Sequence, residues 1–376
     1  MAEKKQNTQG FDEYLRQGEP SQRKKALLWA TSIGLQQVDG LQTSEYLHDI
    51  ARRNIEDEIS TTEGQQLIAS YYEQLNARRN TELLNTEEAD RSAANIAHIL
   101  SSATLDFTTH GFKSLHRQIF NGVVKHAGEF RTYDISKHEW VLHGASVLYL
   151  SHSELQRALD YDIAQERAFS YTRLSTDEIV AHITHFVAGI WQIHPFGEGN
   201  TRTTAVFAIQ YLRSLGFDVD NEMFALHSWY FRNALVRANY KSATVDYDFK
   251  FLERFFRNLL LGEHHELRNR YMLINAEEQM PNKYRTSTEQ VPNKLAEVAP
   301  SVAALVKAIG DKELKITEMM EAVGLKHRPT FLYNYLTPAI EAGLVTMLYP
   351  NSPRHPRQRY RLTPKGTIFL NQTYSE

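Results

Sequence analysis

Two apolar runs at helical spacing, separated by a short polar loop, constrain the fold of this chain more than any other feature. The first run ends at Trp191 and the second begins at Val206, and each repeats its apolar side chains at the period of an α-helix. Pro195 and the glycines at 197 and 199 interrupt the helical pattern between the two runs. Residues 193–204 are therefore predicted to form a loop held between two buried helices, an arrangement that positions reactive groups well.

The loop carries side chains suited to phosphate chemistry. His194 supplies an imidazole, Glu198 a carboxylate and Arg202 a guanidinium. Residues 199–201 lead directly into the second helix, whose N-terminal amides and dipole favour an anion. Each fragment alone is typical of an ordinary loop histidine or turn. Six specified residue types in fixed register indicate a site.

The segment 193–204, I-H-P-F-G-E-G-N-T-R-T-T, resembles the motif of the Fic family, H-x-F-x-[DE]-G-N-G-R-x-x-R. The matching residues are His194, Phe196, Glu198, Gly199, Asn200 and Arg202. Thr201 stands where the family has its second Gly, and Ala205 stands where it has its last Arg. The resemblance implies a nucleotidyltransferase that moves AMP, or another NMP, from ATP or another NTP to a hydroxyl of a target protein.

Residue chemistry and resemblance assign the same roles within the loop. His194 is expected to be the base, because imidazole titrates near neutral pH, and Glu198 is expected to hold Mg²⁺, a cation that prefers oxygen ligands. Arg202 is expected to bind a phosphate, and Phe196 to face the core. The residues predicted to contact the nucleotide are Phe196, Gly197, Glu198, Gly199, Asn200, Thr201, Arg202 and Tyr230. Tyr230 resembles the family's aromatic wall of the adenine pocket, with a core aromatic as the alternative.

The two departures from the motif predict a change in phosphate binding and regulation. In the family, the last Arg grips the terminal phosphates and is the group that an inhibitory Glu competes for. Ala205 cannot do this, and the similar stretch 35–40 has Leu35 and Asp39 in place of the family's Ser/Thr and Glu. Both halves of the Arg-Glu lock are therefore expected to be missing. Thr201 adds a Cβ that is expected to narrow the phosphate cradle.

A β-hairpin is predicted from Trp140 to Tyr149, where a Gly is flanked by β-forming residues. It resembles the Fic flap, which aligns the backbone of the target protein by strand addition. The target is therefore expected to dock on residues 140–149. The alternative is an ordinary surface hairpin.

Composition limits the remaining options. The net charge of −3 excludes a globally basic nucleic-acid binder but allows a local basic patch. The absence of cysteine excludes disulfides and thiolate metal sites. No apolar run is long enough for a membrane span, and the N-terminus lacks the pattern of a secretion signal. A cytoplasmic, bacterial-type protein without membrane contact is expected.

The fold is predicted to be mainly α: a Fic-type helical bundle with a β-hairpin flap, plus a C-terminal winged helix-turn-helix. Four segments are expected. They are an antitoxin-like helical module (1–100), the Fic catalytic domain (101–262), a helical linker (263–299) and the winged helix-turn-helix (300–376).

The tail adds a second functional hypothesis. Helices, a turn and two strands across a Pro-rich tip resemble a winged helix, and positive charges gather at Arg354, Arg357, Arg359, Arg361 and Lys365. DNA binding through the wing and the helix at 330–342 is one interpretation, and a protein-binding or merely solvated surface is the other. The alternative function is thus a DNA-binding regulator or toxin-antitoxin-like protein whose Fic domain senses nucleotide with little or no turnover. The oligomeric state stays open, with a homodimer as one option.

Overall fold

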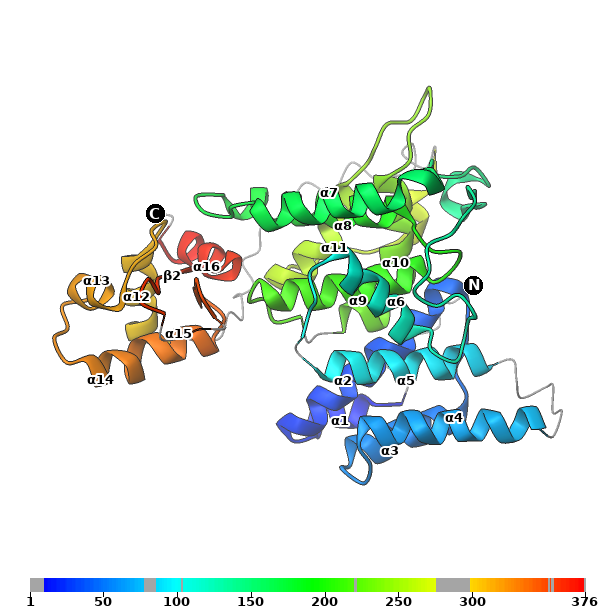
Figure 1. Ribbon diagram of the computed structural model, residues 1–376, viewed down its shortest axis with the longest axis horizontal. Helices are drawn as coiled ribbons and strands as arrows, with labels where there is room; N and C mark the ends of the chain where they lie inside the picture. Colours follow the sequence, from blue (N-terminus) through cyan, green and yellow to red (C-terminus); the bar gives the residue numbers. More distant parts are fainter. Residues whose placement is uncertain are drawn as a thin grey trace.

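The computed structural model describes residues 10–77, 86–102, 104–219, 222–274, 298–350, 352 and 355–374, and it is mainly helical (Figure 1). The prediction of a mainly α fold is therefore confirmed. Within these ranges, β-structure is confined to one two-stranded sheet near the C-terminus. No helix in the same ranges combines the length and apolar character that a membrane crossing requires.

The N-terminal helices are α1 (Asp12–Gln17), α2 (Pro20–Gly34), η1 (Leu35–Asp39), α3 (Glu45–Ile55), α4 (Thr61–Ala77) and α5 (Glu87–Ser101). Ser44 begins α3 by accepting a hydrogen bond from the Leu47 amide at 3.2 Å. Gly40 takes a left-handed conformation and ends η1. These are the boundaries that cap and breaker residues favour in this stretch.

The central elements are η3 (Trp140–Leu142), η4 (His152–Glu154), η5 (Asn269–Met272), α6 (Thr109–Ile119), α7 (Leu155–Ala168), α8 (Thr176–Ile193), α9 (Asn200–Ser214), α10 (Met223–Ala238) and α11 (Lys250–Leu261). The start of α8 is a capping box. Ser175 Oγ accepts from the Glu178 amide at 3.2 Å, and the Glu178 carboxylate accepts from the Ser175 amide at 2.7 Å. This capping box fixes where α8 begins. The other end of α8 leads into the loop that starts at His194.

A single hydrophobic core joins the N-terminal and central helices. Its buried residues run from Phe11 to Met272 without a break at residue 100, where the first two segments were expected to separate, and they also include Ile368 of the C-terminal helix 364–374. α2 packs against both α5 and α10, and Ser228 Oγ on α10 donates to the Gly34 carbonyl at 2.7 Å. The N-terminal helices are thus part of the same packed body as α8 and α9.

The hairpin prediction for residues 140–149 is wrong. Trp140–Leu142 forms the short helix η3, and His143 and Gly144 both take positive φ in the turn that follows. Val141 and Leu142 are both buried although they are adjacent, which a strand with alternating faces does not allow. The Glu139 amide donates to the Ala145 carbonyl at 3.0 Å, so the segment closes on itself as a compact loop.

The C-terminal unit comprises α12 (Pro300–Ile309), α13 (Ile316–Ala322), α14 (Arg328–Phe331), the π-helical turn η7 (Leu332–Leu336), α15 (Thr337–Glu341), β1 (Val345–Met347), β2 (Tyr360–Leu362) and α16 (Pro364–Tyr374). β1 and β2 are antiparallel, with Val345 opposite Leu362. The predicted order of helices and paired strands is present, and the winged-helix name stays a prediction. The unit has its own core, built around Leu305, Phe331 and Leu344.

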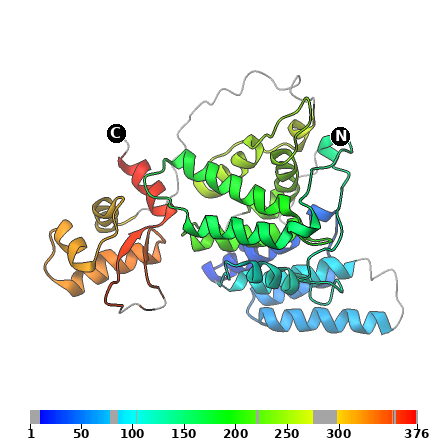
Figure 2. The same ribbon diagram turned by 45° about the horizontal axis from the view of Figure 1, so that its top comes forward.

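The C-terminal unit meets the central helices at one junction, where α16 lies beside α8 (Figure 2). Gly216 and Gly343 touch backbone to backbone: a Cβ on Gly216 would lie 2.2 Å from the Gly343 carbonyl oxygen. Asn371 Nδ2 on α16 donates to the Leu174 carbonyl at 3.1 Å, and Arg173 pairs with Asp311 at 2.5 Å.

Only part of the expected linker, 263–299, can be compared with the structure. Residues 263–274 lie along the central helices, and Met272 of η5 is buried in their core. Residues 275–297 lie outside the described residues.

Candidate active site

The loop begins where α8 ends at His194, which takes a left-handed conformation with φ of 50°. Such a conformation is uncommon for a residue with a side chain, and surrounding bonds must hold it. Arg131 does this: its amide donates to the Pro195 carbonyl and its Nε to the His194 carbonyl, both at 2.9 Å. Its guanidinium also bonds the Leu150 carbonyl. Arg131 therefore ties the loop to the segment 131–150.

His194 is only 1% exposed, and its two ring nitrogens have different surroundings. Nδ1 lies 3.2 Å from the Trp191 carbonyl, which can only accept, so Nδ1 carries the proton. Nε2 is buried without a hydrogen-bond partner among the described residues. Burial lowers the pKa of His194 well below its usual value, and the positive charge of Lys137 lowers it further. At neutral pH, Nε2 therefore holds a free lone pair.

Phe196 and His116 stack beneath the loop, with ring centroids 3.7 Å apart. His116 Nδ1 accepts from the Gly128 amide at 2.8 Å, so Nε2 donates to the Glu198 carbonyl at 3.1 Å. Burial lowers the pKa of His116 to about 4 and keeps this ring neutral. Asn200 closes the loop from within: its Oδ1 accepts from the Phe196 amide and its Nδ2 donates to the Phe196 carbonyl. Phe196 thus faces the core, as expected.

The phosphate cradle predicted at residues 197–201 coincides with the start of α9. Gly199 precedes the helix with φ of 71°, and a Cβ there would lie 2.2 Å from Phe120 Cζ, so only glycine fits. No side chain caps α9, which leaves its first amides to a ligand or solvent. Gly197 and Glu198 beside it are exposed. This geometry provides an anion site with one free carboxylate at its edge.

Thr201 and Ala205 lie in the packing between helices. Thr201 is buried, and its Oγ1 accepts from Trp191 Nε1 at 3.0 Å. Its side chain is therefore bound to α8, and the expected narrowing of the cradle finds no support in this placement. Ala205 is completely buried and supplies no charge, as expected.

The guanidinium of Arg202, for which phosphate binding is predicted, is already paired with other side chains in the structure. Arg202 is 1% exposed, and its nitrogens contact side chains of the N-terminal helices: Gln36 at 3.0 Å, Ser92 at 3.2 Å and Glu88 at 2.6 Å. Its Nε forms an ion pair with Asp39 at 2.7 Å, without hydrogen-bond geometry. Asp39, which stands where the family has its inhibitory Glu, thus pairs with Arg202, and the predicted loss of the lock at Ala205 stays a prediction.

Tyr230 is a buried residue of the core. Its side chain is buried on α10, and its hydroxyl donates to the Phe251 carbonyl of α11 at 3.2 Å. This is the placement of a core aromatic, the alternative interpretation of the residue.

Two family profiles match the chain. That of the Fic/DOC family matches residues 106–212, and that described as Filamentation induced by cAMP protein Fic-like, C-terminal domain, matches residues 300–363. The chain carries a Fic domain. Among solved structures, a Fic family protein from Desulfovibrio desulfuricans G20 is 20% identical over 73% of this chain and 75% of its own, with a TM-score of 0.35. No curated protein matches the sequence.

Two residues outside the motif, Arg131 and His116, hold the motif loop in place through hydrogen bonds. Arg131 sits in a compact segment with nothing in its spacing to mark it, and His116 is one of 16 histidines. Both act on the loop through backbone carbonyls, and hydrogen bonds to carbonyls leave no trace in a residue pattern. The partners of Arg202 are side chains of η1 and α5, which are so distant in the sequence that spacing within the motif cannot reveal them.

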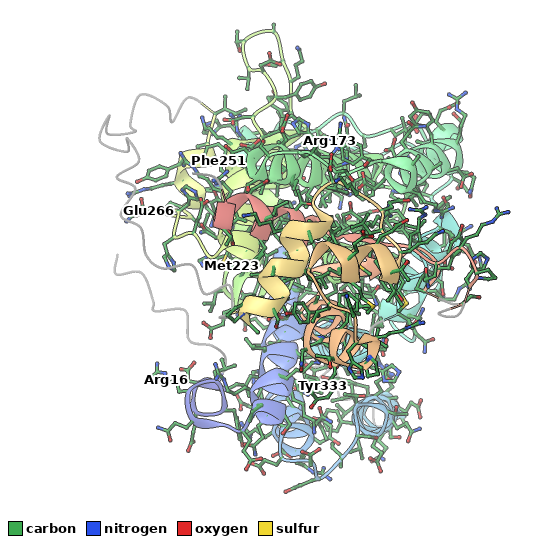
Figure 3. All side chains as sticks on the ribbon, turned by 90° about the vertical axis from the view of Figure 1, so that its left-hand side faces the viewer. Arg16, Arg173, Met223, Phe251, Glu266 and Tyr333 are labelled. Atoms are coloured by element: carbon green, nitrogen blue, oxygen red, sulfur yellow. The ribbon has the colours of Figure 1, made fainter. Side chains whose placement is uncertain are left out.

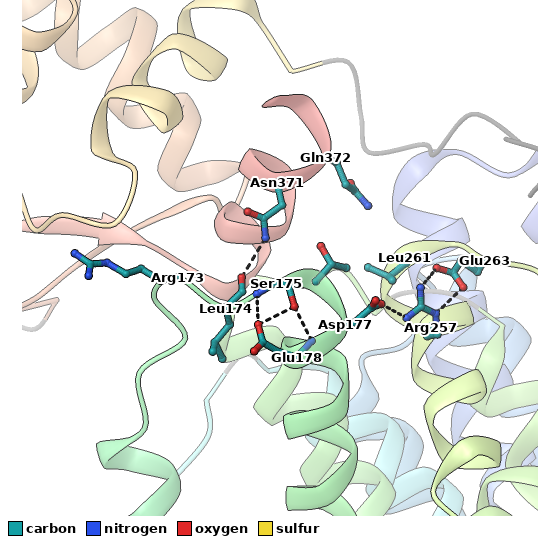
Figure 4. Close-up of a pocket in the computed structure, with 11 residues that line it drawn as sticks. Arg173, Leu174, Ser175, Asp177, Glu178, Arg257, Leu261, Glu263, Asn371 and Gln372 are labelled. Atoms are coloured by element: carbon teal, nitrogen blue, oxygen red, sulfur yellow. Dashed lines mark hydrogen bonds and ion pairs between the residues drawn. The ribbon is translucent and has the colours of Figure 1, made fainter. Parts of the chain in front are cut away.

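A pocket of about 700 Å³ lies at the opposite end of α8 from His194, between the Fic domain and α16 (Figure 4). Its lining includes Asp177, Arg257, Glu263 and Asn371. Arg257 is paired with Glu263 at 2.7 Å and with Asp177 at 2.5 Å, so its charge is neutralised. The pocket is part of the junction with the C-terminal unit and lacks the motif residues.

Magnesium fits the loop only together with a phosphate ligand. The described residues contain no group of three or more His, Asp or Glu side chains that could hold a metal by themselves. Glu198 offers one exposed carboxylate next to the uncapped start of α9. Mg²⁺ commonly takes one or two carboxylates and completes its shell with phosphate oxygens and water. The donor set is consistent with an NTP·Mg²⁺ complex.

Proposed function

We propose that this chain is a protein nucleotidyltransferase that moves AMP, or another NMP, from an NTP to a hydroxyl of a target protein. The observation that carries the proposal is the buried Nε2 of His194, which has no partner and lies on the loop that leads to the uncapped start of α9. A base and an anion site on one short loop are what hydroxyl attack on a phosphate requires.

The residues of the loop divide the reaction between them. The target's O–H proton passes to Nε2 of His194, and the hydroxyl oxygen forms a bond to the α-phosphorus. The bond from that phosphorus to the pyrophosphate oxygen breaks, and pyrophosphate leaves with the electron pair. Amides at the start of α9 bind phosphate oxygens. Glu198 would hold Mg²⁺, which would neutralise phosphate charge.

The target protein is proposed to dock on residues 140–149 and their neighbours, although these do not form a hairpin. Leu148 is 85% exposed, and Trp140 and Tyr133 are about half exposed. Tyr149, in the same segment, places its ring 4.2 Å from that of His194. Exposed aromatic and aliphatic side chains beside a reactive group are typical of a binding surface.

Intact-mass spectrometry tests this function. The purified protein is incubated with Mg²⁺ and each NTP in turn, alone and with a cell lysate, next to the variant His194→Ala. An added nucleotide mass on the protein itself or on a lysate protein, lost in the variant, identifies both reaction and donor. If neither wild type nor variant adds a nucleotide mass while both bind nucleotide, the alternative of a nucleotide-sensing Fic domain stands. If wild type and variant add the same amount of nucleotide mass, His194 is not the base.

We also infer a second candidate function, DNA binding by the C-terminal unit. It is inferred from the exposed surface formed by α14, η7 and the residues just before them. Tyr333 is 81% exposed there (Figure 3), and Lys326, Arg328 and Asn334 are exposed with it. The strands contribute less charge than their sequence indicates. Arg359 bonds the Glu313 carbonyl and pairs with Glu318, and Arg361 pairs with Glu313. Arg354 lies outside the described residues.

Binding of a labelled DNA duplex, measured at about 50 and about 200 mM salt, tests this second function. Arg328→Ala should weaken binding and reduce its salt dependence, whereas Lys241→Ala, on the Fic domain, should leave both unchanged. Binding that is absent, or insensitive to salt, would rule the function out.

A further inference from the structure

Four cationic side chains belong to, or contact, the segments that surround His194: Arg131, Lys137, Arg202 and Arg232. Three of them already have partners. The guanidinium of Arg131 bonds backbone carbonyls, and that of Arg202 contacts the N-terminal helices. Arg232 pairs with the fully buried Glu139 at 2.7 Å. Among the described residues, the Lys137 ammonium alone of the four makes no hydrogen bond and no ion pair.

Hydrogen bonds hold the backbone of Lys137 in place within the segment 131–150. Its amide donates to Ser146 Oγ at 3.0 Å. Two residues later, the buried Glu139 accepts from the Tyr149 hydroxyl at 3.3 Å, and the Tyr149 ring packs on His194. The backbone that carries Lys137 is therefore fixed to the wall of the His194 site, and its side chain is partly buried there.

The charge of Lys137 acts on groups of the proposed site. Its ammonium interacts electrostatically with the carboxylates of Asp39, Glu139 and Glu198, and its charge also acts on His194. Burial lowers the pKa of Lys137, and the nearby Arg232 lowers it further, while the three carboxylates oppose this shift. Lys137 is thus a partly buried cation on the segment whose Tyr149 packs on His194, and its charge is available to the phosphates of a bound nucleotide.

We propose that Lys137 binds the terminal phosphates of the donor nucleotide, in place of the Arg that Ala205 does not supply. The proposal rests on the proposed transferase function and assigns a cation to the leaving pyrophosphate. When the bond between the α-phosphorus and pyrophosphate breaks, negative charge grows on the leaving oxygens, and an ammonium beside them stabilises it. A lysine binds phosphate as a point charge and needs no bidentate geometry.

A purely structural role for Lys137 makes a different prediction. If its charge only balances Asp39 and Glu139, removing it should lower stability and leave phosphate binding unchanged. If it binds phosphate, removing it should weaken phosphate binding in proportion to the number of phosphates, and stability should hold.

The test measures equilibrium binding by isothermal titration calorimetry, with Mg²⁺ present. The probes are ATP, ADP, AMP and inorganic tripolyphosphate, which has no base and reports phosphate contact whatever the natural nucleotide. Wild type is compared with Lys137→Ala, Lys137→Arg and the matched control Lys241→Ala, a surface lysine paired with Asp246. Thermal melting of each variant reports stability.

Lys137→Ala should bind ATP and tripolyphosphate about 10- to 100-fold more weakly, the loss expected for a charge-assisted bond. AMP should be affected much less, Lys137→Arg should retain most of the affinity, and Lys241→Ala should match wild type. Equal affinity of Lys137→Ala and wild type for ATP would overturn the proposal. If wild type also transfers a nucleotide mass, the transferase function survives that result. A wild type that binds neither ATP nor tripolyphosphate would overturn both.

Discussion

The N-terminal helices share one hydrophobic core with the Fic domain, whereas the C-terminal unit has a second core of its own and contributes Ile368 of α16 to the shared one. The two attachments also differ in chemistry. At the N-terminal side, Glu88 and Asp39 contact a buried guanidinium of the motif loop. At the C-terminal side, two glycines touch through their backbones, and the ion pair of Arg173 is exposed.

This difference indicates how strongly a movement of each region would affect the residues around His194. Any movement of η1 or α5 must change the contacts of Arg202, which lies in the first turn of α9, the helix after the reactive loop. The C-terminal unit instead contacts the far end of α8, a full helix away from His194. The N-terminal helices are therefore structural members of the site, and the C-terminal unit is a neighbour that can be loosened without dismantling it.

The largest expected effect comes from removing the buried guanidinium. Arg202→Ala removes a buried guanidinium from Glu88 and Asp39, and because these carboxylates are about one third exposed, the expected cost is at the lower end of about 3 to 5 kcal/mol in free energy of unfolding. Urea unfolding measures it. The control Arg257→Ala breaks partly exposed pairs and should cost less than about 1 kcal/mol. Equal costs would show that the Arg202 cluster does not hold the N-terminal helices.

Acid should weaken the shared core. The pKa of His116 is about 4 in the folded chain, below its unfolded value, so its contribution to stability is complete above pH 6.5 and is lost as pH falls toward 4. The loss at the lower limit is about 3 kcal/mol. Urea unfolding at neutral and acidic pH measures this, and His116→Gln should remove that part of the dependence. The described part of the C-terminal unit has no buried histidine, so a separate transition there should not follow this curve.

The junction itself should be sensitive to a single methyl group. Gly216→Ala places a Cβ against the Gly343 carbonyl at a positive φ and should weaken docking of the C-terminal unit by about 1 to 3 kcal/mol. Calorimetry should then resolve two unfolding transitions. Gly324→Ala is the matched control, because Gly324 has a similar φ and open space around it. If both variants melt alike, backbone strain rather than the contact explains the change.

The smallest effect is expected at the exposed ion pair of the junction. Arg173→Ala should leave the calorimetric transitions where they are, because solvent screens a pair whose Arg side chain is 79% exposed. A clear separation of two transitions in this variant would contradict the view that backbone contact holds the junction.

Much of the fold was predictable because it depends on local patterns. Apolar periodicity located α8 and α9, and the Ser175-Glu178 pair marked the start of α8. Pro195 and Gly199 marked the loop between them. The segment 140–149 was mispredicted because η3 buries two adjacent residues and Glu139 holds the loop closed, and both depend on neighbours distant in the sequence.

By itself, the sequence determined that His194, Glu198 and an uncapped helix start share one short loop, because residues this close in the chain cannot lie far apart. The tertiary structure alone decided which of these groups are available. Contacts from η1 and α5 occupy Arg202, and α8 binds the Thr201 hydroxyl. Burial leaves Nε2 of His194 without a hydrogen-bond partner among the described residues. Sequence spacing sets which groups are near, but burial and pairing with distant residues set whether their charges and lone pairs are free to react.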